Sequence, residues 1–277
     1  LVRDYFALSD PDRANSLIII PDNATRDDVM SMVRKELIQK GEVQEANAIT
    51  TKIYDRAGLN RAEKSDARFY KPGQIVEFGK AYKSLHVGEK EKLMVLSTKP
   101  EQGVVILGRL KEDNVTIDRK LPIVTWNPDK IAGKAKYGVE VYDIKEREFN
   151  CGDKIIWTNT INKEGLKNGD RGEIVDKVKK SIFVKFENGN TKWINTDKLK
   201  NFDYVYAVTA HIAQGMTYDR AFISAQSHQV NLVNPQSFYV SVTRAREKSR
   251  LYTDDIDKLS KVLFERTGEK TSSIEFS

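Results

Sequence analysis

The sequence has little cysteine and histidine and no long apolar run. Cys151 is the only cysteine among 277 residues, so no disulfide can form within the chain. The histidines that could join it as metal ligands are His86, His211 and His228. None of them lies at a metal-ligand spacing, so we expect a structural thiol and no metal site. No apolar run approaches the roughly 18 residues that cross a bilayer, and the N-terminus is not typical of a signal peptide. We therefore expect a cytoplasmic protein without membrane insertion.

The sequence also lacks the phosphate-binding loop G-x-x-x-x-G-K-[ST], whose backbone amides and lysine hold the phosphates of ATP. No apolar strand ends in paired acids that could hold Mg²⁺. The acids of the segment TDDIDKL open a helical pattern instead, where aspartate is a favourable N-cap. Without these motifs, the chain alone is expected to bind no cofactor and to hydrolyse no ATP.

The remaining composition is that of a globular, moderately basic protein. With 39% apolar residues the chain can bury a sizeable core, and 277 residues are at the upper end for one domain, so we expect an insertion or a second domain. A net charge of +6 and a pI near 9.1 are compatible with a polyanionic partner. The 46 basic against 40 acidic residues equally suit an ordinary solvated surface. Charge alone therefore assigns no function.

Hydrophobic patterning separates two α/β segments from a β-rich middle. Near the N-terminus the run LIII predicts a buried strand, and the following segment predicts a helix that stops at Gly41. The apolar face of this helix is predicted to hold Val29, Met32, Val33 and Leu37. From about residue 70 to residue 199, short alternating segments such as QIVEF and SIFVKF are separated by turn residues. Longer apolar segments and a final amphipathic helix follow, so the β-rich part is predicted to be an insertion.

We expect residues 1–68 and 201–277 to form one α/β domain around a parallel sheet, with β subdomains at 69–145 and 146–200. The insertion also shows an internal similarity. YKPGQIVEF, which begins at Tyr70, and FNCGDKIIW, which begins at Phe149, share the pattern aromatic-x-x-Gly-x-x-apolar-x-aromatic. Two related small barrels of SH3-like type are one interpretation. Chance similarity of hairpin sequences is the other, so we expect one or two such barrels.

Two polar segments follow predicted buried strands in the last quarter of the chain. In AVTAHIAQGMT, which begins at residue 207, a strand leads to Gly215, which permits close backbone approach. Hydrogen-bonding side chains are supplied around it by Thr209, His211, Gln214 and Thr217.

The segment FYVSVTRARE places Thr243, Arg244 and Arg246 at the end of another apolar stretch. An arginine there can neutralise charge on a transferred phosphoryl group. Gln-Gly alone is usually a turn, and Arg-x-Arg alone usually starts a solvated helix. Both segments in this order are more specific and indicate a nucleotide-binding cleft.

At these residues the chain resembles superfamily 1 DNA helicases. VTAHIAQGMTYDRA is similar to helicase motif V, FYVSVTRARE to motif VI, and LIIIPDNATRDDVMSMVRKEL to the start of the second RecA-like motor domain. More narrowly, FNCGDKIIWTNTINKEGLKNGDRGEIV resembles the helicase part of TraI/TrwC-type conjugative relaxases and the RecD-like branch. The resemblance implies a RecA-like domain with a β-barrel insertion. It implies Arg244 as the arginine finger, and Gln214, Gly215, Thr217, Thr243 and Arg246 around the nucleotide.

The same resemblance implies contacts with single-stranded DNA. The implied contact residues are Thr209, His211, Trp157, Asn159 and Asn168. Contacts are also expected from Lys177, Lys179, Lys180 and Lys192, because they belong to the β segment next to the motif-bearing region. Each has a plainer interpretation. Trp157 alternates with apolar Ile155, so a core position is about as expected as stacking on a base. The turn at Asn168 is by default a hairpin, and the lysines are by default solubilising.

The resemblance also implies a larger parent protein. Such a parent would be bacterial and plasmid-encoded, use ATP and Mg²⁺ to unwind DNA, nick it with a relaxase domain, and be exported to a recipient cell. Since the phosphate loop is lacking, the first motor domain of the parent is expected to lie outside this chain. The alternative function is a non-catalytic recognition module that carries a type IV secretion signal and binds the coupling protein.

Overall fold

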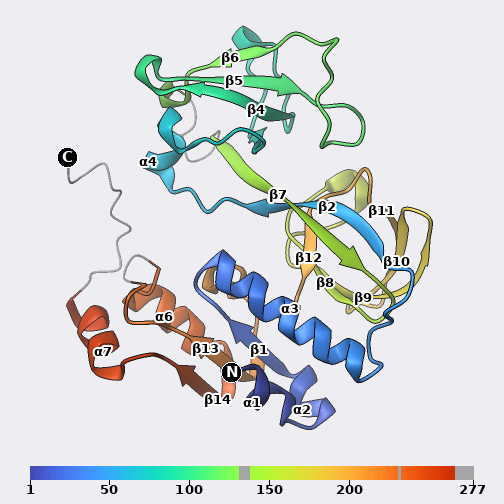
Figure 1. The fold of residues 1–277 in the computed structure, drawn as a ribbon, viewed down its shortest axis with the longest axis vertical. Helices are drawn as coiled ribbons and strands as arrows, with labels where there is room; N and C mark the ends of the chain where they lie inside the picture. Colours follow the sequence, from blue (N-terminus) through green and yellow to red (C-terminus); the bar gives the residue numbers. More distant parts are fainter. Residues whose placement is uncertain (131–137, 230–231, 266–277) are drawn as a thin grey trace.

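The computed structural model of the chain describes residues 1–130, 138–229 and 232–265. Three sheets make up the mixed α/β fold, one parallel and two antiparallel (Figure 1). Parts of the predicted subdomain 69–145 and of the C-terminal segment, at residues 131–137 and 266–277, lie outside the described residues.

The parallel sheet has the strand order β1-β13-β14. Val208, just before α5, adds a parallel bridge to Ile19 of β1, and both are buried. The elements around this sheet are α1 (Val2–Phe6), α2 (Asp10–Ala14), β1 (Ser16–Ile19), α3 (Asn23–Gln39), α5 (Ala210–Ala213), β13 (Tyr218–Ser224), α6 (Pro235–Val242), β14 (Ala245–Tyr252) and α7 (Ile256–Glu265). Segments from both ends of the chain therefore share one sheet.

Helix α3 begins and ends as its sequence predicts. The Asp22 side chain accepts a hydrogen bond from the Thr25 amide at 2.7 Å, and Gly41 takes the left-handed φ of 74° just beyond the last turn. Its buried face differs from the predicted one. Met32 is 56% exposed, whereas Arg26 and Met30 are buried. The buried stripe is therefore rotated from the predicted one, and it includes a charged side chain that an apolar pattern cannot reveal.

The five-stranded lobe has the order β11-β10-β9-β8-β12, and every pair in it is antiparallel. Its strands are β8 (Lys154–Trp157), β9 (Arg171–Val178), β10 (Ser181–Phe186), β11 (Thr191–Asn195) and β12 (Phe202–Tyr204), with the 3₁₀ turn η5 (Asn162–Glu164). One apolar cluster joins Met30 and Val33 of α3 to Trp157, Ile174 and Phe202 of this lobe. The lobe thus shares a core with the α/β part.

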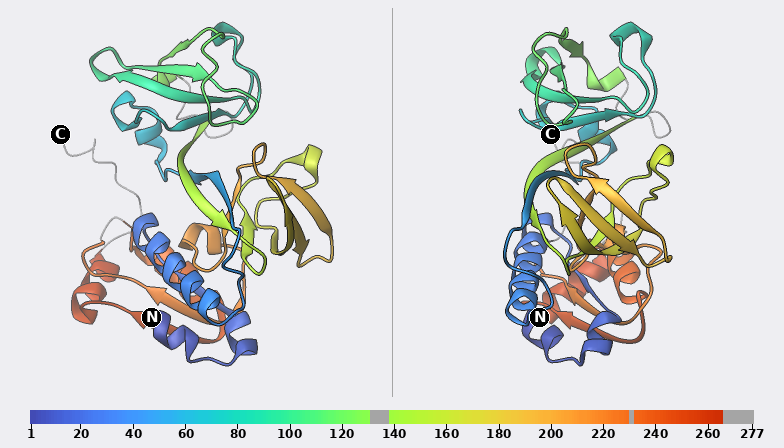
Figure 2. Two further views of the ribbon diagram at one scale, coloured as in Figure 1. Left: turned by 45° about the vertical axis from the view of Figure 1, so that its right-hand side comes forward. Right: turned by 90° about the vertical axis from the view of Figure 1, so that its right-hand side faces the viewer.

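The six-stranded lobe has the order β2-β7-β3-β4-β5-β6. It contains β2 (Ile49–Arg56), α4 (Arg61–Lys64), η1 (Ala67–Phe69), β3 (Ile75–Phe78), η2 (Lys83–Leu85), β4 (Lys92–Lys99), η3 (Pro100–Gln102), β5 (Val104–Arg109), β6 (Val124–Trp126), η4 (Pro128–Lys130) and β7 (Val139–Phe149). Strands β3 to β6 enclose a separate apolar cluster around Trp126. Figure 2 shows the long ribbon of β2 and β7 running from this lobe toward the rest of the molecule.

Strand β2 lies in a different place from the one its sequence position suggests. Residues 49–56 fall within the predicted α/β segment 1–68, but they pair along their whole length with β7. The reason is that strand pairing is non-local. The eight residues of β2 find a partner of 11 residues much later in the chain. Judged by strand pairing, the first α/β segment therefore ends before residue 49 rather than at residue 68.

The two antiparallel lobes repeat one pattern of backbone hydrogen bonds. Equivalent residues are separated by the same number of positions in the sequence, the number that separates Tyr82 from Ile161. The amides of these two residues donate to Val87 and Leu166, both at 2.8 Å. The same spacing relates Gly73 donating to Val95 with Gly152 donating to Ile174, and Lys90 donating to Phe78 with Gly169 donating to Trp157. A β-bulge falls at Leu96 in one lobe and at Val175, its counterpart, in the other. The repeat suggested by the sequence is thus present in the backbone.

Candidate nucleic-acid interface

An open cleft of roughly 2010 Å³ lies where the three sheets meet. The α/β part contributes the start of α3, the segment around α5 and one side of α6. The five-stranded lobe contributes residues 157–158 and the turn 167–171, and the six-stranded lobe contributes the end of β2 and the start of α4. Segments far apart in the sequence therefore form one site.

The segment predicted to be motif V, residues 207–217, forms part of the cleft wall. Thr209 accepts a hydrogen bond from the Ala213 amide at 2.9 Å and so begins α5, and Gly215 then takes a φ of 87° that few other residues adopt. Gln214, Gly215 and Thr217 are exposed and line the cleft, as does Thr209. His211 belongs to α5, but its side chain lies outside the described part of the structure. Four of the residues predicted in this segment are thus brought to one surface.

The motif VI residues Thr243, Arg244 and Arg246 follow α6 and are not among the residues that line the described cleft. The Arg244 guanidinium donates to the carbonyls of Val240 at 2.9 Å and Met216 at 3.0 Å, and to the Thr243 hydroxyl at 2.9 Å. Arg244 therefore ties the end of α6 to the motif V segment. Arg246 is largely exposed, 3.8 Å from Asp219.

Trp157 lies in the core rather than in a position to stack on a base. It is 1% exposed, and its ring stacks on Phe202 with centroids 5.6 Å apart. The alternation with Ile155 already allowed this outcome, and burial in the shared core decides it.

Asn159 is also engaged within the protein. Its amide nitrogen lies 3.4 Å from a carboxylate oxygen of Glu77 and 3.5 Å from the Tyr142 hydroxyl, so it joins the two antiparallel lobes.

The four predicted DNA-contacting lysines do not line the cleft. Lys180 pairs with Asp197 at 2.7 Å, Lys192 pairs with Glu164 at 2.7 Å, and Lys177 donates to the carbonyl of Asn47. Lys179 is exposed on a turn with a φ of 53°. Asn168 does line the cleft and is exposed on the turn after Leu166. Of the predicted DNA-contacting residues, Asn168, Thr209 and the buried Trp157 therefore lie at the cleft.

Sequence reasoning missed the basic residues that line the cleft, which are Arg26, Arg56, Arg61, Lys64, Lys167 and Arg171. Only Lys167 carried a usable signal, because it adjoins Asn168 in the predicted turn. The others come from α3, the end of β2, the start of α4 and the start of β9. Their proximity depends on how the three sheets pack, which no local pattern reveals.

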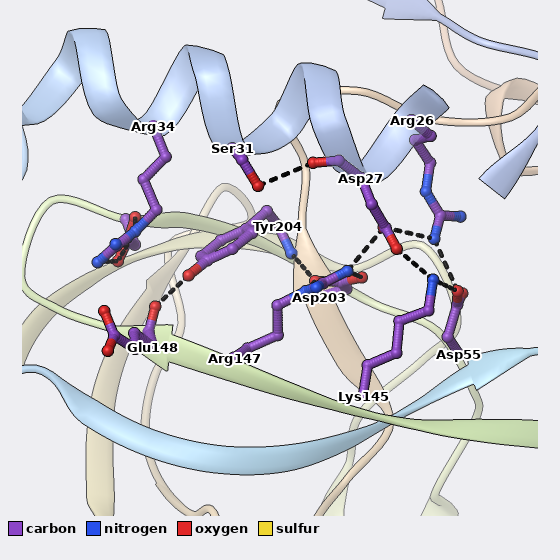
Figure 3. A network of polar contacts seen from close by, with 11 residues as sticks. Arg26, Asp27, Ser31, Arg34, Asp55, Lys145, Arg147, Glu148, Asp203 and Tyr204 are labelled. Atoms are coloured by element: carbon purple, nitrogen blue, oxygen red, sulfur yellow. Dashed lines mark hydrogen bonds and ion pairs between the residues drawn. The ribbon is translucent and has the colours of Figure 1, made fainter. Parts of the chain in front are cut away.

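A network of ion pairs fixes the junction at the cleft (Figure 3). Arg26 of α3 pairs with Asp55 of β2 at 2.9 Å, and Arg147 of β7 pairs with Asp27 at 2.7 Å and with Asp203 of β12 at 3.1 Å. Burial opposes the charge of Arg26, but the attraction of Asp55 and Asp203 outweighs it and raises the pKa of Arg26. The network holds α3, the β2–β7 ribbon and the five-stranded lobe in one geometry.

Within the described ranges, no helix is long and apolar enough to cross a bilayer, and no group of three or more His, Cys, Asp or Glu residues could hold a metal ion. Three polar atoms of cleft residues are buried without a hydrogen-bond partner: Arg26 Nε, Trp157 Nε1 and Thr158 Oγ1. These three atoms belong to residues of the cleft wall that lack a partner within the described protein.

A family model matches part of the chain. Residues 204–252, which include the segments around α5 and α6, match the model of the UvrD-like helicase C-terminal domain. This part of the chain is therefore similar to a helicase C-terminal domain. Among solved structures, a Pif1 helicase from Bacteroides in complex with ADP-AlF3 and ssDNA aligns over 91% of this chain and 43% of its own, at 16% identity and a TM-score of 0.43. Pif1 from Candida albicans aligns over 93% and 50%, at 9% identity and a TM-score of 0.43.

The chain is also similar to curated conjugal transfer proteins. The chain is 30% identical over 135 residues to the conjugal transfer protein TraA of Rhizobium radiobacter, covering 46% of this chain and 12% of that protein. It is 32% identical over 110 residues to TraA of Agrobacterium fabrum, covering 39% and 10%. The predicted resemblance to conjugative-transfer helicases is confirmed. The chain spans only about a tenth of the length of these relatives.

Proposed function

We propose that this chain is the second motor-domain segment of a conjugative DNA helicase and relaxase. In this proposal, β1, β13 and β14 with their helices form the RecA-like domain. Strands β2–β7 and β8–β12 are two small SH3-like subdomains inserted into it. The observation that carries the proposal is the cleft shared by the predicted motif V segment and both antiparallel lobes. The family match over residues 204–252 supports it.

The segment would supply one wall of a nucleotide site and part of a strand-binding groove. Arg244 is proposed as the arginine finger, with Gln214, Gly215, Thr217, Thr243 and Arg246 near the nucleotide. Exposed amide, hydroxyl and guanidinium groups suit phosphate oxygens. ATP and Mg²⁺ are proposed for the complete parent, with its first motor domain and relaxase domain as partners, and no cofactor is proposed for this chain alone.

Two assays test this function on the purified chain. Titration of a labelled single-stranded oligonucleotide at several salt concentrations is expected to show weak binding that falls steeply with salt, because phosphate contacts release counterions. A coupled ATPase assay is expected to show no turnover. Turnover that disappears in Arg244→Ala, or failure to bind any oligonucleotide at low salt, would contradict the proposal.

A second candidate is a recognition module that carries a type IV secretion signal and binds the coupling protein. The observation that favours it is an aromatic pair on the outer face of the five-stranded lobe. Trp193 is 46% exposed and lies 5.0 Å from the Phe183 ring, beside exposed Val175 and Val178. Binding of purified coupling protein that is lost in Trp193→Ser would support this candidate, and unchanged binding would count against it.

A further inference from the structure

The basic residues of the cleft differ in whether an acid already neutralises them. Arg26 pairs with Asp55 at 2.9 Å, Lys64 with Glu140 at 2.6 Å, and Arg171 with Glu187 at 2.9 Å. Arg61 also has an interaction within the protein. Arg56 and Lys167 form no ion pair with any described residue. These two side chains therefore provide cleft charge that is not engaged in an ion pair with a described carboxylate.

Arg56 stands where the three parts of the molecule meet. It is the last residue of β2, and its carbonyl accepts a hydrogen bond from the Asn23 amide group at the start of α3, at 3.2 Å. Its guanidinium donates to the Thr158 carbonyl, just after β8, at 3.4 Å. One long contact leaves most of the five guanidinium donors available. A half-buried arginine held in this way is suited to bind a phosphate group in a fork geometry.

Lys167 lies on the opposite lobe, on a turn that is rigid although its side chain is exposed. The Asp170 carboxylate accepts a hydrogen bond from the Lys167 amide at 2.7 Å, and the Asp170 carbonyl accepts one from the Trp157 amide at 2.7 Å. The backbone is thereby fixed, while no described partner holds the ammonium group. Lys167 can therefore meet an anion without breaking an existing interaction.

We infer that Arg56 and Lys167 are the principal phosphate-binding side chains of the cleft. The strand would then pass between the end of β2 and the turn 167–171, and not along the lysines of β9–β11. This inference rests on the proposed function, since it takes single-stranded DNA as the ligand. The lysines fit the role less well, because Lys180 and Lys192 already pair with acids and Lys177 with backbone carbonyls.

The test uses the full chain and a fluorescein-labelled oligothymidylate in anisotropy titrations at several salt concentrations. Arg56→Ala and Lys167→Ala are each expected to weaken binding about tenfold at low salt and to lower the salt slope by about one. Arg56→Lys keeps the charge and should recover part of the loss. Lys185→Ala, which removes one exposed charge from β10 outside the cleft, is the matched control and should change affinity less than twofold.

Failure of this inference and failure of the proposed function give different results in these titrations. If wild-type protein binds but a Lys179→Gln/Lys180→Gln variant loses affinity while Arg56→Ala and Lys167→Ala do not, the inference is wrong and DNA binding stands. If no oligonucleotide binds at low salt, the proposed function fails, and the inference fails with it. Displacement of the oligonucleotide by ATP, with both variants weakening ATP binding, would assign the pair to a free nucleotide instead and overturn the inference.

Discussion

The two antiparallel lobes have the same backbone scaffold and use it in different ways. In the six-stranded lobe, Glu77 is 4% exposed and pairs with Lys92 at 3.1 Å and with Lys90 at 3.4 Å. Its counterpart in the five-stranded lobe is the buried, uncharged Ile156, and the turn that follows faces the cleft. One copy of the repeat therefore places a buried acid beside two lysines, while the other places an apolar side chain there and leaves Lys167 of the next turn without an ion pair to a described residue. The comparison shows that the repeat specifies a scaffold and that a few side chains decide whether it becomes a binding surface.

The lobes also differ in how they are attached to the α/β part. The five-stranded lobe shares an apolar core with α3, whereas strands β3–β6 enclose a core of their own. Gly73 and Gly152 mark this difference, since both take a φ of 91° at equivalent positions. A Cβ on Gly73 would meet open space, while one on Gly152 would overlap the Glu42 carbonyl after α3. The five-stranded lobe therefore packs so closely against the α/β part that no side chain fits at residue 152.

The largest expected effect comes from substituting these two glycines by alanine. Both variants adopt a strained left-handed backbone, which costs about 1–2 kcal/mol. Gly152→Ala must also displace the backbone near Glu42, which adds about 1–3 kcal/mol. Urea unfolding should therefore show Gly152→Ala to be less stable than Gly73→Ala by at least ~1 kcal/mol. Equal losses in the two variants would mean that the lobes are attached alike.

A smaller effect is expected from the acids that neutralise lysines in each lobe. Glu77→Gln removes the charge that balances Lys92 in a buried setting and should lower the free energy of unfolding by about 1–3 kcal/mol. Glu164→Gln breaks the more exposed pair with Lys192 and should cost at most ~1 kcal/mol. Thermal unfolding of both variants at one salt concentration provides the comparison. A larger loss in Glu164→Gln would contradict the assignment of Glu77 as the internal counter-charge.

The smallest effect is expected at the turn that precedes β4 in one lobe and β9 in the other. The Asp170 carboxylate accepts from the Lys167 amide at 2.7 Å, and its counterpart Glu91 accepts from the Gly88 amide at 2.6 Å. Asp170→Ala should cost about 0.5–1.5 kcal/mol, the usual value of one such hydrogen bond. Glu91→Ala should cost somewhat more, because Glu91 also pairs with Arg109. Chemical unfolding that ranks the two variants the other way would show that the turns are not equivalent in stability.

Much of the fold follows from local sequence patterns. The buried strand β1, the capped start of α3, its end near Gly41 and the repeat that relates the segments at Tyr70 and Phe149 could all be predicted, because each depends on neighbouring residues. The position of β2 could not be predicted, since its partner β7 lies far along the chain. The same reason hides the role of Arg56, which reaches the cleft only through that pairing.

The candidate site was predictable in part. The motif V residues Gln214, Gly215 and Thr217 share one surface because they lie in one short segment. The DNA contacts of the four lysines remain a prediction, although acids and carbonyls from other turns hold Lys177, Lys180 and Lys192 within the protein. A charge count along the sequence cannot tell a neutralised lysine from a free one.

Hydrogen–deuterium exchange of the whole chain, with and without a saturating single-stranded oligonucleotide, tests the contrast between the two lobes most directly. Peptides covering residues 157–171 and 54–64 should exchange more slowly when DNA is bound, because the strand covers the cleft wall that they form. Peptides covering residues 78–92, the equivalent part of the other copy, should exchange at the same rate in both conditions. Protection of residues 78–92 equal to or greater than that of 157–171 would contradict the account.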